Sequence, residues 1–295
     1  MFTPTPTTPT LPDPQTLVAQ AIKKVTVIAT LPEVTAHIVS TVDDPKSTAS
    51  QLHKIVAHDP ALVTRILKVV NSAFYGLPGQ IGSVERAIVL LGLNAVKNIA
   101  VAASLGQLFR GVKLCEGFTA KDLWIHSIAV AVTSRELAKR LKLPIHDEAF
   151  LAGLIHDVGL LVELHTSPEA LRQTATQIQK EGGDFCTAER ELLGYDHQQL
   201  GMGLTELWKF TRSCQLVAGY HHQPSALSDN HRVLVTLVHA ADTICCQKKL
   251  GFNLTALHQQ LDQPAIREIG LSSDVIEEAV NNLDVQLTSA MGTLG

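Results

Sequence analysis

The 295-residue sequence is short of aromatic residues and of positive charge, and each shortage excludes a class of protein. Aromatic side chains make up only 4% of the residues, whereas small and branched aliphatic residues dominate a hydrophobic fraction of 45%. That composition suits closely packed helices better than a sandwich or barrel of strands. The formal net charge of -4 and the absence of any lysine or arginine run predict no nucleic-acid partner.

Cysteine is also scarce and shows no paired motif. The five cysteines include no CxxC pair, and their number is odd: Cys115, Cys186, Cys214, Cys245 and Cys246. They are interpreted as reduced thiols that fill the core. Because Cys245 and Cys246 are adjacent, a relaxed disulfide between them or a shared metal ion is disfavoured, and inert burial is the preferred interpretation.

Long apolar runs are missing as well. No apolar stretch reaches the roughly 18 to 20 residues needed to span a bilayer, because polar residues interrupt even the region 87–108. The N-terminus has neither the charged start nor the apolar centre of a signal peptide, so we expect a cytoplasmic protein without a membrane partner. Residues 1–14 are a threonine and proline tract that cannot sustain a helix, and they are predicted to be a disordered leader.

Helical periodicity is what the sequence has in abundance. Apolar residues recur at spacings of three and four from Gln15 onward, with capping residues before many runs and glycine or proline after them. Helices are predicted at about 32–41, 47–56, 59–70, 83–91, 93–109, 120–141, 146–164, 168–181, 185–193, 196–208, 212–221, 229–248 and 273–290. No segment alternates as a strand does, so the predicted fold is all-α.

The chain length favours a division into two packed lobes, since single cores stop growing near this size. The predicted fold is a two-lobed helical bundle with lobes at 15–110 and 119–295. Residues 110–119 include two glycines and form the expected hinge.

The most informative feature is a histidine beside an aspartate in a run that is otherwise apolar. His156 and Asp157 lie in the segment Gly153-Leu-Ile-His-Asp-Val-Gly159, whose other residues favour burial. Burying an imidazole and a carboxylate without partners costs several kcal/mol, so something must satisfy them. For this pair alone two explanations stay open, namely a metal ion or a hydrogen-bonded pair within a helical core.

Further imidazoles and carboxylates lie at the starts of predicted helices. Asp122 and His126 are four residues apart, so a helix places them on one face, where they could share an ion or form an ordinary hydrogen bond. His197 begins a helix next to Asp196, where it could equally be a capping or surface imidazole.

Others lie at a helix end or in mid-helix. His221 and His222 end a predicted helix, where the helix dipole favours cationic imidazoles without any metal. Asp242 has apolar helical neighbours, and a ligand role explains its position better than solvation does. His239, three residues earlier, could orient a ligand, although core packing is the preferred interpretation.

Taken together, these residues are a full set of nitrogen and oxygen ligands for one or two metal ions: Asp122, His126, His156, Asp157, His197, His221, His222 and Asp242. Mixed imidazole and carboxylate ligands favour divalent iron, manganese, cobalt, nickel or zinc, and a carboxylate between two ions favours a binuclear site. Two such ions activate water and polarise a phosphoryl oxygen. The pattern therefore favours phosphate-ester hydrolysis, with Asp157 as the catalytic candidate.

The order His126, His156-Asp157, Asp242 resembles the HD superfamily of metal-dependent phosphohydrolases, and the full set resembles the HD-GYP cyclic-di-GMP phosphodiesterases. The first lobe resembles the HDOD domain, a bacterial signalling module related to them. Four segments carry that likeness: Leu31-Pro32, Asp59-Pro-Ala-Leu62, Asn71-Ser-Ala-Phe-Tyr-Gly76 and Ala87-Ile-Val-Leu-Leu-Gly92. It covers about residues 25–248.

The HDOD resemblance implies an all-helical regulatory protein that acts through signalling partners or a nucleotide-like ligand. Two departures from the hydrolase pattern count against activity. Leu160 stands where HD phosphodiesterases usually carry a phosphate-contacting lysine, and no GYP element follows His221-His-Gln-Pro224, so an anionic substrate loses a charge-assisted contact. The leading hypothesis is a metal-binding regulatory protein; the alternatives are an active phosphodiesterase or phosphatase and a metal-free interaction protein.

The loop at Asn71 and at residues 74–76 is predicted to serve architecture. Asn71 is expected to tie the loop backbone by side-chain hydrogen bonds, while Phe74 and Tyr75 pack between helices. A direct ligand contact by these residues is the alternative.

Overall fold

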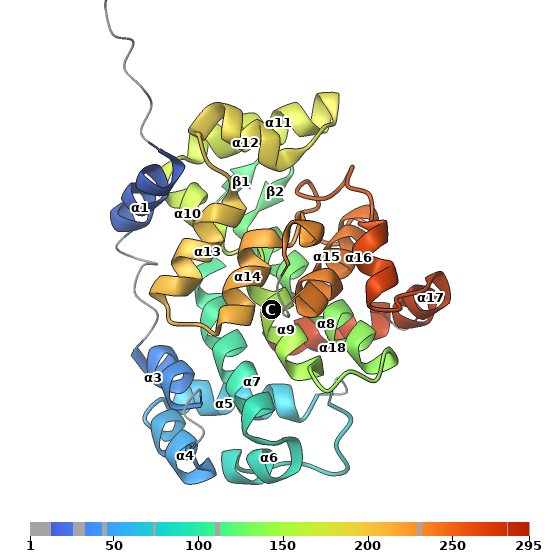
Figure 1. Cartoon of the computed structure of the whole chain (residues 1–295). Helices are drawn as coiled ribbons and strands as arrows, with labels where there is room; N and C mark the ends of the chain where they lie inside the picture. Colours follow the sequence, from blue (N-terminus) through green and yellow to red (C-terminus); the bar gives the residue numbers. More distant parts are fainter. Residues whose placement is uncertain are drawn as a thin grey trace, which may run out of the picture.

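The structure, a computed structural model, describes residues 13–25, 33–42, 46–72, 75–109, 113–228, 232–281 and 283–294. The predicted leader lies outside these parts of the chain except for Asp13 and Pro14. Helices make up nearly all of the regular structure, which confirms the all-α prediction (Figure 1).

In the first lobe, helices begin where the sequence supplies caps. Asp59 accepts a hydrogen bond from the Leu62 N–H at 2.9 Å, and Pro60 occupies the first turn, where its missing N–H costs nothing. Thr48 and Gln51 form a reciprocal capping box. The described helices of this lobe are α3 (Glu33–Val42), α4 (Ala49–Ala57), α5 (Pro60–Val70), α6 (Val84–Leu91) and α7 (Leu93–Leu105).

The second lobe is organised around α8 (Ala120–Arg140), a 21-residue helix that is buried along most of its length. It packs against α9 (His146–Ile155), α15 (Arg232–Gln247), α17 (Ser273–Val280) and α18 (Leu283–Leu294). The other helices of the described chain are α1 (Pro14–Lys24), η1 (Gly106–Phe109), α10 (Gly159–Thr166), α11 (Pro168–Glu181), α12 (Phe185–Leu193), α13 (His197–Leu207), α14 (Arg212–Tyr220), η2 (Pro224–Ala226) and α16 (Gln263–Glu268).

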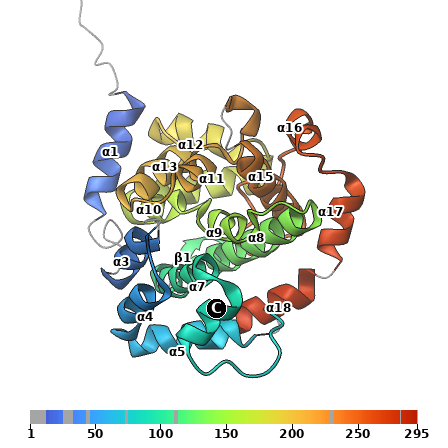
Figure 2. The same ribbon diagram turned by 60° about the horizontal axis from the view of Figure 1, so that its bottom comes forward.

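Helices α8 and α9 lie in the middle of the molecule (Figures 1 and 2). Helices α10 to α13 lie to one side of them, α15 to α17 to the other, and α3 to α6 beyond one end. The first described helix, α1, packs on α10 and α13, and the last, α18, packs on both α5 and α8. One cluster of buried apolar side chains runs through both lobes, and the division at residues 110–119 stays a prediction.

Two short strands occupy the expected hinge. Strand β1 (Lys113–Cys115) pairs antiparallel with β2 (Phe118–Thr119), and Gly117 takes a φ of 82° at the turn between them. The expectation that no segment forms a strand is wrong at this place. Strands this short cannot display the alternation by which a strand is recognised in a sequence.

The helix predicted at 146–164 is interrupted at its most polar residues. A tight turn at His156, Asp157 and Val158 separates α9 from α10. Hydrogen bonds span three residues there, from the Val158 N–H to the Ile155 carbonyl at 3.1 Å and from the Leu160 N–H to the Asp157 carbonyl at 3.0 Å. The tightened backbone changes the angle between neighbouring side chains, so His156 and Asp157 can face the same space.

The helical run His146–Thr166 is long and apolar enough to cross a membrane, contrary to the expectation that no stretch reaches that length. However, 89% of its most apolar window is buried inside the protein, as in a core helix. A cytoplasmic location stays a prediction.

The loop at Asn71 has the architecture expected of it. The Asn71 side-chain amide donates to the Leu67 and Ile81 carbonyls at 2.8 and 2.9 Å, and its oxygen accepts from the Ile81 N–H at 2.7 Å. The Tyr75 ring packs against the guanidinium of Arg135 on α8, and the guanidinium carbon lies 4.8 Å from the centroid of the ring. This contact joins the two lobes. Phe74 lies outside the described residues.

Candidate metal centre

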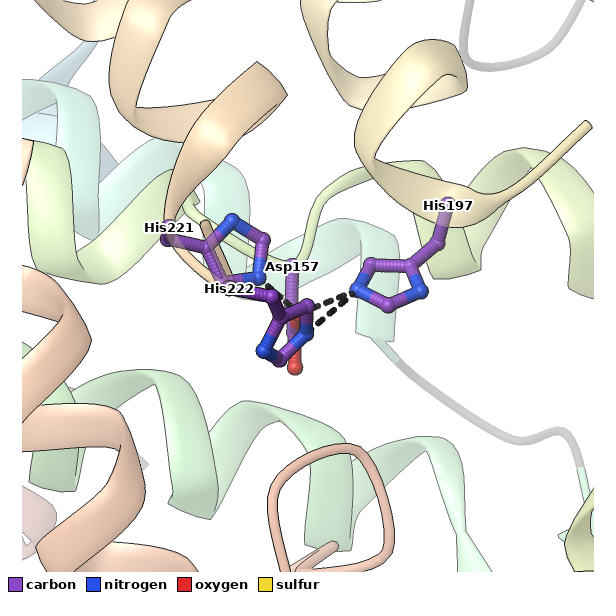
Figure 3. Close-up of side chains that lie close together, drawn as sticks. All are labelled: Asp157, His197, His221 and His222. Carbon is purple, nitrogen blue, oxygen red and sulfur yellow. Dashed lines mark hydrogen bonds and ion pairs between the residues drawn. The ribbon is translucent and has the colours of Figure 1, made fainter. Parts of the chain in front are cut away.

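Seven of the eight predicted ligands converge in the core of the second lobe. They come from α8, from the turn between α9 and α10, from the start of α13, from the end of α14 and from α15. These residues are His126, His156, Asp157, His197, His221, His222 and Asp242. Figure 3 shows four of them, with three imidazoles arranged around Asp157.

One side of the cluster contains two carboxylates and two imidazoles. His126 Nε2 lies 3.0 Å from Asp242 Oδ1 and 3.8 Å from Asp157 Oδ2. His156 Nε2 lies 3.3 Å from Asp157 Oδ2 and 3.7 Å from Asp242 Oδ1. We call these four residues the two-carboxylate side.

The other side contains three imidazoles and the second oxygen of Asp157, with Asp242 Oδ2 at its edge, 3.6 Å from His222 Nδ1. Asp157 Oδ1 lies 3.4 Å from His197 Nε2 and 3.3 Å from His221 Nε2. His222 Nε2 is 3.0 Å from His197 Nε2 (Figure 3). We call this the three-imidazole side. Asp157 lies between the two sides and presents one oxygen to each.

Every imidazole of the cluster is oriented by a hydrogen bond from its Nδ1. The acceptors are the carbonyls of Leu250, Gly153 and Val217 for His126, His156 and His221, Glu189 Oε2 for His197 and Gln259 Oε1 for His222. With Nδ1 donating, each ring in its neutral form has no proton on Nε2, and the Nε2 lone pair then points into the cluster. This is the tautomer that binds metal through Nε2.

The atoms that face the centre lack donors. Both Asp157 oxygens, His156 Nε2, His221 Nε2 and Asp242 Oδ2 are buried and have no hydrogen-bond partner in the described chain. His197 Nε2 and His222 Nε2 lie 3.0 Å apart, and two lone pairs meet there when both rings are neutral. Such an arrangement is costly unless a cation lies among the lone pairs. Neighbouring ligands about 2.1 Å from one ion lie roughly 3 Å apart, so the spacing also fits a metal.

Without a cation the cluster is held by mutual ionisation. Burial opposes charge on His156, but Asp157 and then Asp242 raise the pKa of His156 to about 10. Burial likewise opposes charge on the carboxyls, yet His156 above all lowers the pKa of Asp157, and His126 and His156 lower that of Asp242, both well below the usual range. Burial lowers the pKa of His221 and His222, which stay neutral.

Asp122 is not part of the cluster. Its carboxylate accepts hydrogen bonds from the N–H and the hydroxyl of Thr119, both at 2.7 Å, and so caps the first turn of α8. The side chain therefore points back along the chain and does not join His126, although the two residues are four apart. Asp122 as a ligand stays a prediction that this geometry does not support.

Three residues near the centre were not predicted as part of it. Cys246, four residues after Asp242, donates from Sγ to Asp242 Oδ1 at 3.4 Å, and burial followed by the Asp242 charge raises its pKa well above the usual value. Cys246 is thus a neutral thiol donor. Glu189 and Gln259 orient His197 and His222 from segments with no polar motif that points to the site. Only the i, i+4 spacing of Cys246 was a usable signal.

A family model described as the HDOD domain matches residues 28–224, about two-thirds of the chain. The chain belongs to the HDOD family. The match begins close to the predicted start at residue 25 and ends at Pro224, before α15, which carries Asp242. All the other cluster ligands lie within the matched region of this HDOD chain.

Solved structures share its fold. An HDOD domain protein of unknown function from Geobacter sulfurreducens gives a TM-score of 0.79 at 24% identity, over 95% of this chain and 97% of that one. A candidate phosphohydrolase from Shewanella amazonensis gives 0.70 at 24% identity, over 95% and 98% of the two chains. An uncharacterised protein of Treponema pallidum is 23% identical over 224 residues, which are 75% of this chain but 43% of that protein. The HDOD chain thus spans less than half of that relative.

The metal-free protein is expected to lose stability as the pH rises from about 6.5 to 10. His156, whose pKa is raised to about 10, keeps a proton in the folded state that the unfolded chain has released. The pKa of His197 is also raised, by Glu189 against the effect of burial. Each such proton changes the free energy of unfolding by about 1.4 kcal/mol per pH unit.

Thermal unfolding followed by circular dichroism, with a chelator and with added manganese, measures this slope. A bound ion replaces the protons, so the melting temperature of the metal-loaded protein should fall less over the same pH range. Identical slopes with and without metal would show that the cluster protons make no contribution.

Proposed function

We propose that this HDOD chain is a regulatory protein whose second lobe is held together by two divalent transition-metal ions, and that it acts on protein partners or in response to a nucleotide-like ligand. The proposal rests on the position of Asp157. Its two buried oxygens meet no hydrogen-bond donor in the described chain and face two separate groups of imidazoles. One ion would be held by His126, His156, Asp157 and Asp242, the other by His197, His221, His222 and Asp157. The donor set suits iron, manganese, cobalt, nickel or zinc.

Enclosure of the centre favours regulation over turnover. The side chains of His126, His156, Asp157, His197 and Asp242 are 0% exposed. A phosphodiester cannot approach them unless covering segments move.

The segment 250–262 provides much of that cover. Its Leu250 carbonyl accepts from His126 Nδ1 at 3.2 Å, its Gln259 amide oxygen accepts from His222 Nδ1 at 2.7 Å, and its Asp262 N–H donates to His239 Nε2 at 2.9 Å. Because the same segment orients two ligands, metal occupancy and the surface made by this segment are coupled. A partner that binds that surface would sense the ions.

A cavity of about 1100 Å³ between α1, α13 and α14 supports the ligand part of the proposal. Its walls include Lys23, the ion-paired Arg190 and Asp196, Glu206, the aromatic ring of Tyr220 and the amide of Gln198. The volume is slightly above the range of about 300 to 1,000 Å³ for sites that take small organic ligands. Gln198 also accepts a hydrogen bond from the His222 N–H at 3.0 Å, which connects this cavity to the metal centre.

Elemental analysis of the chain purified without added metal tests the proposal, and roughly two transition ions per chain are expected. An anomalous-scattering map should place both beside Asp157. Protein that takes up no metal, even when manganese or zinc is supplied, would rule out the centre.

The alternative is an active phosphohydrolase, favoured by the completeness of the ligand set and by a fold shared with a candidate phosphohydrolase. Two ions at this site would polarise a phosphoryl oxygen and lower the pKa of water. Leu160, buried at 0% exposure in place of the lysine of related hydrolases, provides no charge for a phosphate.

The regulatory proposal predicts no hydrolysis of bis(p-nitrophenyl) phosphate or of cyclic dinucleotides by the manganese-loaded protein. Metal content must be measured in the same sample, so that inactivity is not mistaken for an empty site. Turnover that disappears in Asp157→Ala would establish the enzyme instead.

A further inference from the structure

A buried glutamate holds one ligand of the three-imidazole side. Glu189, on α12, is 0% exposed, and its Oε2 accepts from His197 Nδ1 at 2.7 Å and from the His197 N–H at 3.1 Å. The two hydrogen bonds fix both the ring and the first residue of α13 against α12. The orientation of His197 Nε2 toward Asp157 therefore depends on Glu189.

The acceptor behind His197 differs in charge from those behind the other imidazoles. His126, His156 and His221 donate to backbone carbonyls, and His222 donates to the neutral amide of Gln259. Among the cluster imidazoles of the described chain, His197 alone donates Nδ1–H to a carboxylate. A carboxylate acceptor makes an imidazole more basic and a stronger metal ligand.

The two sides of the cluster differ in the number of carboxylate oxygens that could balance the charge of an ion. On the two-carboxylate side, Asp242 and one oxygen of Asp157 oppose the charge of an ion. On the three-imidazole side of the described chain, the imidazole Nε2 atoms meet only the other oxygen of Asp157, while Asp242 Oδ2 lies 3.6 Å from His222 Nδ1. A divalent ion there would be poorly neutralised in a buried site, which is unfavourable at low dielectric. Glu189 supplies the missing negative charge one imidazole away.

A second buried glutamate lies beside Glu189. Glu163, on α10, is also 0% exposed, and its oxygens meet no donor in the described chain. Burial, and after it the charge of Glu189, raise the pKa of Glu163 well above the usual value. Burial raises the pKa of Glu189 as well, but the charge of His197 and the two hydrogen bonds from it oppose that shift, and Glu189 is the member of the pair that accepts from His197.

We infer that Glu189 is a positioning residue for the ion on the three-imidazole side, orienting His197 and balancing that ion's charge, while the ion on the two-carboxylate side does not depend on it. The inference rests on the proposed metal centre. It predicts that the two ion positions can be separated by one substitution outside the ligand set.

The test is calorimetric titration of the metal-free full chain with manganese, comparing wild type with Glu189→Gln. Glutamine keeps the size and an acceptor oxygen but removes the charge. Wild type should show two binding phases, one for each side of the cluster. In Glu189→Gln, the phase that belongs to the three-imidazole side should become about 10- to 100-fold weaker or disappear, whether it is the tighter or the weaker phase in wild type. The remaining phase should be unchanged.

Two further variants separate charge from packing. Glu163→Gln places an amide donor where the neutral acid lies, so both binding phases should be retained. Glu189→Asp keeps the charge and should restore part of the affinity that Glu189→Gln loses. Cobalt titrations add a spectroscopic readout, because only the d–d bands of the ion beside His197 should change in Glu189→Gln. Melting of each metal-free variant shows whether the fold is intact.

The outcomes distinguish the two proposals. Two unchanged phases in Glu189→Gln, or equal weakening of both, overturns the role of Glu189 while leaving the metal centre in place. An equal loss in Glu163→Gln and Glu189→Gln also overturns it, since packing alone would then explain both. Wild-type protein that binds no manganese overturns the metal centre and this inference together.

Discussion

Asparagine in place of Asp157 is expected to release both metal ions from the protein. One oxygen of Asp157 lies 3.3 Å from His156 Nε2 and the other 3.3 Å from His221 Nε2, so the substitution removes an anionic ligand from both sides at once. The other acid, Asp242, lies near Nε2 atoms of the two-carboxylate side and reaches the other side only at His222 Nδ1, 3.6 Å away. The loss of affinity should exceed the roughly 10- to 100-fold typical of residues that only orient ligands.

Metal analysis after gel filtration measures the effect, and Asp122→Asn is the matched control. Asp122 is an acid of the same lobe, four residues from His126, but it caps α8 through Thr119. Its replacement should cost about 1 kcal/mol of stability and leave the metal content unchanged. Metal loss in Asp122→Asn together with metal retention in Asp157→Asn would reverse the assignment of ligands.

The elements of the fold that sequence predicts well are those specified by neighbouring residues. The helix that starts at Asp59-Pro60 is an example, because cap and first-turn proline act on the adjacent backbone. The buried pair His156 and Asp157 was equally visible, since two polar groups in an apolar run need a partner wherever they fold.

Competition between local and distant partners was harder to predict. The Asp122 carboxylate could lie beside His126 or cap the N-terminus of its own helix. It caps the helix, because Thr119 offers two hydrogen-bond donors within the same turn. Thr119-x-x-Asp122 is itself a recognisable capping pattern, so the correct outcome was present in the sequence.

The break between α9 and α10 and the role of Glu189 depend on tertiary packing. Apolar periodicity continues through His156, and nothing local marks the tight turn there. Glu189 lies in a segment with ordinary helical polarity, and its burial follows from how α12 meets α13. Such residues become visible only when the helices around them are placed.

Alanine at Gly159 is expected to destabilise the second lobe severely. Gly159 begins α10, where a Cβ would lie 1.9 Å from the His197 carbonyl oxygen and 2.7 Å from the Gly201 nitrogen. Both atoms belong to the backbone of α13, so no side-chain rotation can relieve the overlap, and α10 and α13 must separate. Overpacking against backbone should cost at least about 3 kcal/mol. The separation also moves His197 away from Asp157.

Chemical denaturation of Gly159→Ala, compared with Gly201→Ala, measures this cost. Gly201 lies on α13 at the same helix contact, but the nearest atoms to its added Cβ would be the Ala218 Cβ and the Gly159 nitrogen, both at 3.4 Å, which are ordinary contacts. Alanine at this interior helix position should be neutral or stabilising by up to about 1 kcal/mol. Opposite signs for two glycine substitutions on facing helices would establish that close approach at Gly159 positions the metal ligands. A mild effect at Gly159 would mean that α13 can move without cost, and the enclosure of the centre would then no longer argue against catalysis.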